Sequence, residues 1–204
     1  MIIDDRVPVF VSENRDPHYV FGHCRKPQEL WVALIEKAYA KLHGCYESLN
    51  GGLIDDGLVD LTGHVAEKVK AKNASPEQLW QKLQDFRQHR TLMGCSIDAE
   101  GVESDVIVDG EVSGLLSRHA YGLIDVLYIK NNRAPKGRHR LLRIRNPWGD
   151  REWQGKWSDK DPKLEQNVTA VMTEINKLEE GEHFDPKDSN DGTFLICFLS
   201  LIHI

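Results

Sequence analysis

Apolar residues change their spacing near residue 92, and this change limits the folds open to the chain more than any other feature. Upstream, they recur every three or four residues, which is the spacing of one helix face. A first helix is predicted from Pro27 to His43, because proline suits a first turn and Gly44 is placed to end it. Downstream, runs of β-branched and aromatic residues predict strands.

A second helix is indicated by a capping pattern at its N-terminus. Ser75 is a favoured N-cap, Pro76 suits the first helical position, and Gln78 completes a Ser-x-x-Gln capping box. We expect this helix to run to about Arg90. Between the two helices, residues 50–63 are rich in glycine and aspartate, which predicts turns rather than regular structure.

Strands are predicted over the second half of the chain. Residues 98–112 are acidic and polar and are predicted as a connection, and the basic residues 130–140 as an exposed loop. A further helix is indicated at about Val168 to Glu180. Helices early and strands late are typical of an α+β domain with antiparallel pairing. The predicted strands are Leu92–Ile97, His119–Ile129, Leu141–Asn146 and Thr193–Ser200, with Val7–Val11 as an edge strand or loop.

Charge, hydropathy and cysteine content argue against several classes of protein. The 204 residues, enough for one sizeable domain, carry 32 acids against 26 bases and a net charge of −6, whereas a nucleic-acid partner would need a basic face. No stretch approaches the roughly 18 apolar residues of a membrane span, and the N-terminus has acids where a secretory signal has bases. Four scattered cysteines without a C-x-x-C pattern favour a reducing, cytoplasmic setting and disfavour a zinc site.

Two polar residues stand at the ends of neighbouring predicted strands. His119 opens one strand and Asn146 closes the next. In an antiparallel hairpin the start of the first strand lies beside the end of the second, so we expect the two residues to face each other. That register places Ile129 opposite Lys136 and leaves six residues for the connecting loop.

Strand alternation puts Asn146 on the inward face, together with Leu142 and Ile144. A buried amide without a hydrogen-bond partner costs about 1–3 kcal/mol, and an imidazole N–H is a suitable partner. Trp148 follows and is expected to shield that bond from water. An Asn that orients a His is the arrangement of cysteine proteases, in which the His activates a Cys. The alternative is that His119 is an ordinary surface residue at a strand start.

Several stretches resemble the calpain family of cysteine proteases, in that family's order and over nearly the whole chain. The most specific is Arg145-Asn-Pro-Trp-Gly149, followed by Glu152-Trp and by Gly-x-Trp-Ser-Asp159. The other matching stretches are Leu30–Gly44, Tyr46–Gly52, Gly114–Tyr121 and Asp191–Phe194.

The resemblance implies an α+β fold, namely a papain-like protease core of two lobes with antiparallel β-sheets and flanking helices. Residues 1–204 then represent mainly the second lobe, which supplies the family's catalytic His and Asn. His119 and Asn146 match those two positions, and Trp148 matches the tryptophan that follows the Asn. The implied activity is calcium-dependent endopeptidase cleavage of intracellular proteins, with protein or peptide substrates and no organic cofactor.

The family also binds a calcium ion in each lobe. In the second lobe, the resemblance maps the ligands onto Glu152, Asp159 and Asp191. Hard oxygen ligands from separate loops suit Ca²⁺, which accepts six to eight oxygens. Many family members have a Glu where this chain has Thr193, so we expect a weaker site. The alternative for Glu152 and Asp159 is two solvated acids near a strand end.

Two segments match parts of the family that line the substrate cleft. Gly51 and Gly52 lie where family backbone approaches the substrate, and residues 98–112 lie where the family has a mobile loop. Both are therefore predicted to contribute to substrate binding.

None of the four cysteines has the setting of a nucleophile. Cys24 has no following Trp, whereas the family's nucleophile sits in Gly-x-Cys-Trp at a helix start. Cys45 follows a helix end, and Cys95 and Cys197 are predicted in strand interiors, where small buried cysteines are usual. We therefore expect the first lobe, with the nucleophile and the oxyanion donor, to lie upstream, and this chain alone to be inactive.

Two functional hypotheses follow, besides the weak alternative of an unrelated binding module. The chain is either one part of a calpain-type protease or a non-catalytic relative that binds calcium or a partner. The C-terminal run Phe194–Ile204 stays apolar where relatives turn acidic, which suggests an altered end, and an exposed tail of this kind would favour aggregation.

Overall fold

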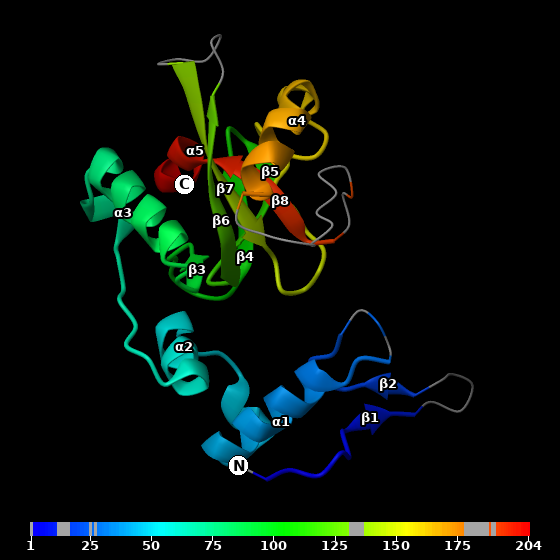
Figure 1. The fold of residues 1–204 in the computed structure, drawn as a ribbon. Coiled ribbons are helices and arrows are strands. Elements are labelled where there is room, and N and C mark those ends of the chain that lie inside the picture. Colours follow the sequence, from blue (N-terminus) through cyan, green and yellow to red (C-terminus); the bar gives the residue numbers. More distant parts are fainter. Residues whose placement is uncertain are drawn as a thin grey trace. The chain divides into compact units, whose positions relative to one another are not determined.

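The computed structural model of the chain divides into two compact units, Met1–Gly57 and Leu58–Ile204. Figure 1 gives the element labels used below. No helix among the described residues is long and apolar enough to span a membrane. The residues described are 2–11, 17–24, 26, 28–130, 137–177, 188 and 191–204.

The first unit is built around helix α1 (Trp31–His43). Lys37 and Lys41 on this helix bind the extended N-terminal segment, since the Lys41 ammonium donates to the Ile2 carbonyl at 2.7 Å and the Lys37 ammonium binds the Asp4 carboxylate. The other elements are strands β1 (Val9–Phe10) and β2 (His18–Tyr19), which pair with each other, and the 3-10 helix η1 (Tyr46–Leu49).

Two expectations in this region need correction. The first helix ends at His43 before Gly44 as predicted, but it begins at Trp31, and the predicted start at Pro27 lies outside the described residues. Residues 50–63 are not a run of turns, because helix α2 (Ile54–Thr62) crosses the boundary between the units. Two aspartates in its first turn favour the helix N-terminus electrostatically, and Gly63, with a φ of 70°, ends it.

The second unit contains a four-stranded antiparallel sheet in the order β3-β6-β7-β8 and a separate β4-β5 hairpin, together with helices (Figure 1). The expected α+β class with antiparallel sheets is therefore confirmed. The strands are β3 (Met93–Ser96), β4 (Ser104–Val108), β5 (Glu111–Ser117), β6 (Ala120–Lys130), β7 (Arg138–Arg145) and β8 (Thr193–Cys197). The helices are η2 (Ala71–Asn73), α3 (Pro76–Gln88), α4 (Pro162–Ile175) and α5 (Phe198–His203).

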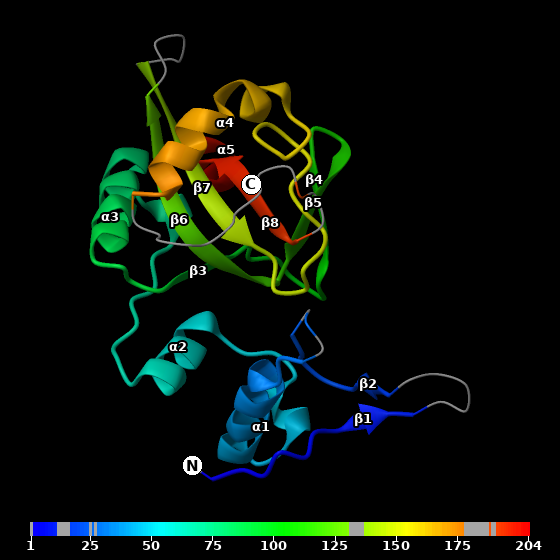
Figure 2. The same ribbon diagram turned by 45° about the vertical axis from the view of Figure 1, so that its right-hand side comes forward.

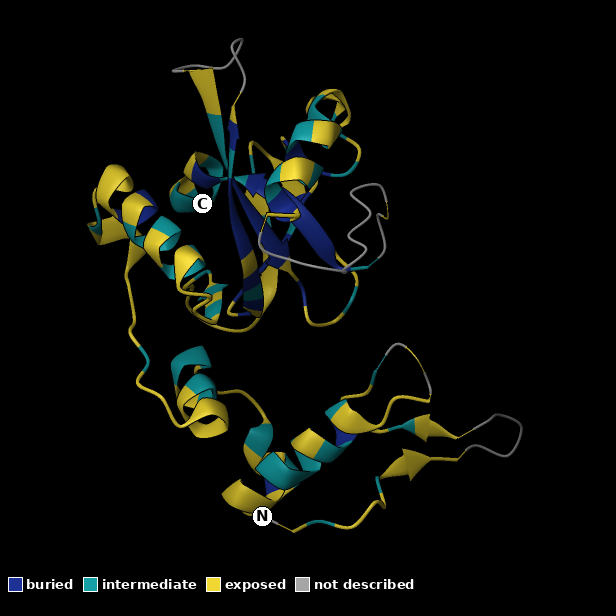
Figure 3. Cartoon of the chain, in the orientation of Figure 1, coloured by how far each residue is buried: buried dark blue, intermediate teal, exposed yellow. Residues whose placement is uncertain are grey.

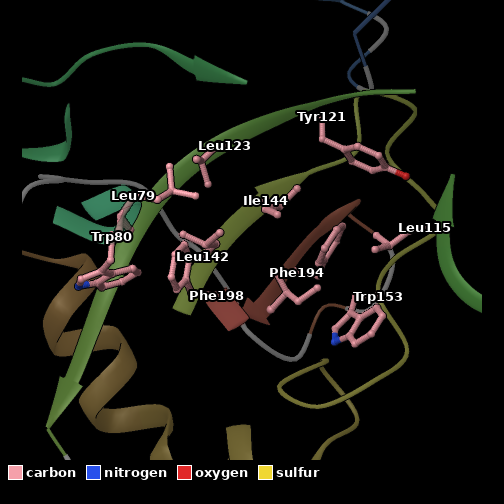
Figure 4. Packing of buried hydrophobic residues seen from close by; sticks show 12 residues of the cluster. Leu79, Trp80, Leu115, Tyr121, Leu123, Leu142, Ile144, Trp153, Phe194 and Phe198 are labelled. Atoms are coloured by element: carbon pink, nitrogen blue, oxygen red, sulfur yellow. The ribbon is translucent and has the colours of Figure 1, made fainter. Parts of the chain in front are cut away.

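Both faces of the sheet are apolar, which explains why its central strands are buried along most of their length (Figure 3). Side chains alternate between the faces, so Leu142 and Ile144 join one cluster while Leu141 joins the other. One cluster, shown in Figure 4, includes residues of α3, α5 and the hairpin. The other includes residues of α4, the helix that lies along the sheet in Figure 2. The prediction of one inward face was therefore incomplete, because α4 covers the second face.

Helix α3 begins after Ser75 with Pro76 in its first turn, as predicted, and ends at Gln88. The predicted capping box is absent, since the Ser75 side chain makes no capping hydrogen bond. The helix is instead held to the sheet by side chains, because the Gln84 amide donates to the Val126 carbonyl at 3.2 Å. Leu79 and Trp80 contribute its buried face.

Three further predictions of secondary structure are corrected. Residues 98–112 are not only a connection, because β4 and the start of β5 form a hairpin there. The predicted loop at 130–140 is shorter, since β7 starts at Arg138, and residues 131–136 lie outside the described part of the chain. The predicted helix at 168–180 is observed as α4, which starts earlier, at Pro162, and ends at Ile175.

The end of the chain is also different from the prediction. Strand β8 stops at Cys197, and the residues after it form α5 instead of continuing the strand. Phe198 is fully buried, and Leu201, Ile202 and Ile204 pack against the same apolar cluster as Trp80. These residues therefore pack against the core, although Leu199 is 48% exposed, and the apolar run does not form the kind of exposed tail that would favour aggregation.

Candidate active site

His119 lies immediately before β6, after a tight turn from β5. Arg118 in that turn has a φ of 57°, and its backbone N–H donates to the Ile97 carbonyl at 2.8 Å. The turn directs the His119 ring inward, where 6% of the residue is exposed. Tyr121 and Trp148 each make an edge-to-face contact with the ring, with centroids 4.9 and 4.6 Å away.

Asn146 follows β7 and is fully buried, with every polar atom of its side chain satisfied. Its Nδ2 donates to the carbonyl oxygens of Asp150 and Arg151, at 2.7 and 3.3 Å. This fixes the orientation of the amide and leaves Oδ1 to accept hydrogen bonds from the Trp148 backbone N–H at 3.1 Å and from Nε2 of His119 at 2.8 Å. Nε2 of His119 therefore carries a hydrogen.

The contact between His119 and Asn146 is present, but the predicted strand register is wrong. Ile129 pairs with His139 instead of facing Lys136. The register also changes between Leu123 and Asp125, where β6 has one extra residue and forms an irregularity of the bulge type. Pairing at the open end of the hairpin begins only at Gly122 and Arg145, so the two side chains meet beyond the ladder.

Trp148 contacts the His119 ring, as the prediction of a shielding indole required, yet 56% of the residue is exposed. The indole therefore covers one side of the imidazole and presents its other side to solvent. An exposed aromatic surface beside a buried imidazole is suited to contact an extended peptide.

Glu103 is a member of this site that sequence reasoning missed. Its Oε2 lies 3.0 Å from Nδ1 of His119, so both ring nitrogens of the histidine face oxygen acceptors. Glu103 belongs to the acidic segment before β4, and nothing in its local sequence distinguishes it from Glu100. Only the folding of the β4-β5 hairpin brings Glu103 to the imidazole.

Of the four cysteines, Cys95 has a setting that is opposite to that of a nucleophile. Cys95 lies in β3 and packs against the apolar cluster, and burial raises the pKa of its thiol to about 12. A nucleophilic cysteine needs the opposite shift, because the thiolate is the reactive form. Cys24 and Cys45 belong to the first unit, and Cys197 ends β8. All four are free thiols.

The three predicted calcium ligands lie in the second unit, around the start of β8. A Glu152 carboxylate oxygen accepts a hydrogen bond from the Gly192 N–H at 2.8 Å, and an Asp191 oxygen accepts one from the Thr193 N–H at 2.6 Å. Both carboxylate oxygens of Asp159 are buried without a hydrogen-bond partner. Burial raises the pKa of Asp159 to about 8, helped by a hydrogen bond that its protonated form makes to Glu152 and by the nearby charges of Glu152, Asp191 and Asp188.

A buried carboxyl that is short of hydrogen-bond donors and surrounded by other carboxyls fits a bound cation electrostatically. Across the described parts of the chain, however, no three His, Cys, Asp or Glu side chains are already gathered in an arrangement that could hold a metal ion. The acids thus supply the charge and the oxygen atoms for a cation, and coordination would require them to converge.

The two predicted substrate segments belong to different units. Gly51 and Gly52 are exposed in the first unit between η1 and α2, and Gly51 has a φ of 89°, which favours glycine. The 98–112 segment belongs to the second unit and contributes Glu103 to the site. Within the second unit, the structure brings together His119, Asn146 and Trp148.

Comparison with known proteins gives a consistent result. A family model described as "Calpain family cysteine protease" matches residues 1–203. The chain is 35% identical to the calpain-2 catalytic subunit of Bos taurus over 199 residues, which is 97% of this chain and 25% of the relative. It is 42% identical to a calpain of Schistosoma mansoni over 179 residues, which is 86% of this chain and 22% of the relative.

A third relative is a calpain-type cysteine protease of Arabidopsis thaliana, 37% identical over 188 residues, which is 89% of this chain and 8% of the relative. The chain therefore spans a quarter or less of the length of these relatives.

Proposed function

The chain belongs to the calpain family of cysteine proteases, and from this premise we propose that it supplies the His–Asn half of a Cys-His-Asn endopeptidase site. The observation that carries the proposal is the buried hydrogen bond of 2.8 Å between Nε2 of His119 and Oδ1 of Asn146. That bond orients the imidazole and leaves Nδ1 as the nitrogen that would receive a proton from a thiol.

In the proposed mechanism, Nδ1 of His119 takes the thiol proton while the sulfur attacks the scissile carbonyl carbon. The same nitrogen then gives the proton to the leaving amine, and a water molecule releases the acyl group by the reverse exchange. Asn146 holds the ring throughout, and Trp148 limits the access of water to one side of it. Trp148, Gly51, Gly52 and the 98–112 segment are proposed to contact the peptide substrate.

We propose that the thiol and the oxyanion donor come from a separate first lobe, which is the partner this chain needs. Both ring nitrogens of His119 face Asn146 and Glu103 rather than a cysteine, and burial raises the Cys95 pKa to about 12. The chain alone is thus expected to lack peptidase activity. The four free thiols favour a reducing, cytoplasmic setting.

A chimera tests this function. The Cys-bearing first lobe of the bovine calpain-2 catalytic subunit would be joined to this chain and assayed with a fluorogenic peptide. We expect no hydrolysis by the chain alone and alkylation-sensitive hydrolysis by the chimera. His119→Ala should lower kcat by about 10³-fold and Asn146→Ala by less, because the base itself contributes about 10²–10⁴. A folded but inactive chimera would contradict the proposal and favour a non-catalytic binding role.

We also propose that Glu152, Asp159 and Asp191 hold Ca²⁺. Support comes from the buried carboxylate of Asp159, whose two oxygens find no donor in the protein. The ion would neutralise these charges and draw the loop before α4 toward β8. Because Thr193 replaces a carboxylate common in the family, calorimetric titration of this chain should give binding weaker than about 1 μM, and tighter binding would contradict the weakened site.

A further inference from the structure

The second ring nitrogen of His119 is already occupied. Nδ1 lies 3.0 Å from Oε2 of Glu103, while Nε2 is bound to Asn146. The histidine side chain is 7% exposed and that of Glu103 is 35% exposed. The carboxylate thus approaches the imidazole from the solvent side, and it covers the only ring nitrogen that Asn146 leaves free.

Hydrogen-bond chemistry requires a proton between these two groups. Asn146 accepts a hydrogen from Nε2, because its own Nδ2 is turned toward two backbone carbonyls. If Nδ1 carried no hydrogen, its lone pair would face a carboxylate oxygen at 3.0 Å, which is repulsive. The contact is therefore attractive only with a hydrogen on Nδ1 or on Glu103, and a charge-assisted bond of the first kind is the stronger arrangement.

We propose that Glu103 is an inhibitory latch, which occupies the position on Nδ1 of His119 that a cysteine thiol must take. The proposal rests on the proposed function, since a latch matters only where a thiol competes for the same nitrogen. With Glu103 in place, His119 cannot accept a thiol proton. When Glu103 rotates away, Nδ1 becomes available while Asn146 still holds the ring.

The surrounding loop holds the latch but leaves its side chain room to turn. On one side, the Arg118 guanidinium donates to the Ala99 carbonyl at 3.2 Å. On the other side, the Ser117 hydroxyl donates to the Ser104 carbonyl at 3.2 Å. Neither contact involves the Glu103 side chain, so release needs a rotation of that side chain and no break in these anchors.

The test on this chain is carbethoxylation of histidine by diethyl pyrocarbonate, which reacts with an available, unprotonated ring nitrogen. Trypsin cleavage after Arg118 and Lys130 isolates a peptide in which His119 is the single histidine. Exposed His18 serves as the internal reference for reagent reactivity. The variants are Glu103→Ala and Glu103→Lys, which both remove the acceptor, with Glu100→Gln on the same loop as the matched control.

We expect Glu103→Ala and Glu103→Lys to raise the labelling of His119 relative to His18 by about tenfold, the factor for losing a hydrogen bond between charged groups. Glu100→Gln should leave the ratio at the wild-type value. Equal ratios in wild type and in both Glu103 variants would overturn the latch. A variant that does not fold will show strong labelling of every histidine. If one of the two Glu103 variants behaves in this way, the ratio measured on the other variant is used to test the latch.

A second measurement addresses inhibition itself and uses the chimera described above. Glu103→Ala should raise the rate at which iodoacetamide alkylates the active-site thiol by about tenfold, because the thiol no longer competes with a carboxylate for Nδ1. An unchanged or lower rate would overturn the inhibitory role. An inactive chimera would contradict the proposed function alone, since the labelling of His119 in this chain does not depend on catalysis.

Discussion

At the scale of single residues, the site depends on how completely each buried polar atom is paired. Asn146 has all of its side-chain hydrogen-bonding groups satisfied, which explains how an amide remains stable at zero exposure. Asp159 differs from Asn146 in this respect, because neither of its buried carboxylate oxygens accepts a hydrogen bond from the protein. The first residue is therefore held in one orientation, and the second needs either a proton or a bound cation to neutralise its charge.

Asp159→Asn tests that contrast. Folding at neutral pH requires Asp159 to take up a proton, because burial beside Glu152 and Asp191 raises its pKa to about 8, and a neutral amide avoids that cost. Without calcium we therefore expect the substitution to raise the free energy of unfolding by about 1–3 kcal/mol. Calcium should stabilise the wild type and not the variant, as measured by thermal unfolding at several calcium concentrations. Exposed Asp109→Asn is the control and should change stability by about 0.5 kcal/mol or less. A less stable Asp159→Asn in calcium-free buffer would contradict this account.

At the scale of elements, one arginine joins two helices that contribute to the apolar clusters on opposite faces of the sheet. Arg87 on α3 donates to the Asp125 carboxylate on β6, with a shortest distance of 2.6 Å. It also donates to the Glu174 side chain on α4 at 3.2 Å. All three side chains are largely buried. The network lies beyond β3, where β6 pairs only with β7.

Arg87→Met should lower the free energy of unfolding by about 3–5 kcal/mol, because it leaves Asp125 buried without its partner. Arg151→Met provides the control, since Arg151 pairs with Asp105, both side chains are about half exposed, and such surface pairs contribute about 0–1 kcal/mol. Urea denaturation of both variants measures the difference. Similar losses of unfolding free energy in the two variants would show that burial of the Arg87 network does not add to the stability of the fold.

Gly114 in β5 is required by its backbone conformation and by a close neighbour. Its φ is 83°, and a Cβ there would lie 1.9 Å from the Glu152 carbonyl oxygen. Gly114→Ala should therefore destabilise the fold by more than Gly110→Ala, where φ is 84° and a Cβ meets open space. We expect about 1 kcal/mol at Gly110 and several times that at Gly114, from chemical denaturation. Equal losses of unfolding free energy at the two positions would mean that the cost comes from backbone strain alone and that the close contact with Glu152 adds nothing to it.

At the scale of the whole molecule, the two units differ in how much apolar surface they bury. Both apolar clusters consist of residues of the second unit. In the first unit, helix α1 carries large apolar side chains with high exposure, such as Trp31 at 60% and Leu42 at 54%. The second unit thus has a core of its own, whereas the first unit leaves large apolar side chains exposed.

A fragment starting at Gly63 should therefore fold by itself, with one cooperative thermal transition close to that of the full chain. The cut leaves α2 intact on the other side and removes no member of either cluster. The complementary fragment of residues 1–62 should be marginal, because so short a chain buries too little apolar area. Differential scanning calorimetry of both fragments tests this prediction. If the longer fragment showed no thermal transition, the second unit would not have an independent core.

Local pattern was enough to predict features that depend on neighbours along the chain. Gly44 ends α1, Pro76 opens α3, and β3 and β6 lie close to their predicted bounds. The predictions failed where a segment was judged polar or turn-rich, as at α2 and β4. In β4 the residues are mostly exposed, so their strand is stabilised by pairing with β5, which local composition does not report.

The sequence by itself determined the α+β class, the family and the juxtaposition of His119 with Asn146, because antiparallel geometry brings the open ends of a hairpin together whatever its loop. Only the tertiary structure decided the register, which an extra residue between Leu123 and Asp125 shifts. It also decided the placement of Glu103 on His119 and the unpaired state of Asp159. These features depend on contacts between residues distant in the chain, and such contacts leave no periodic trace in a single sequence.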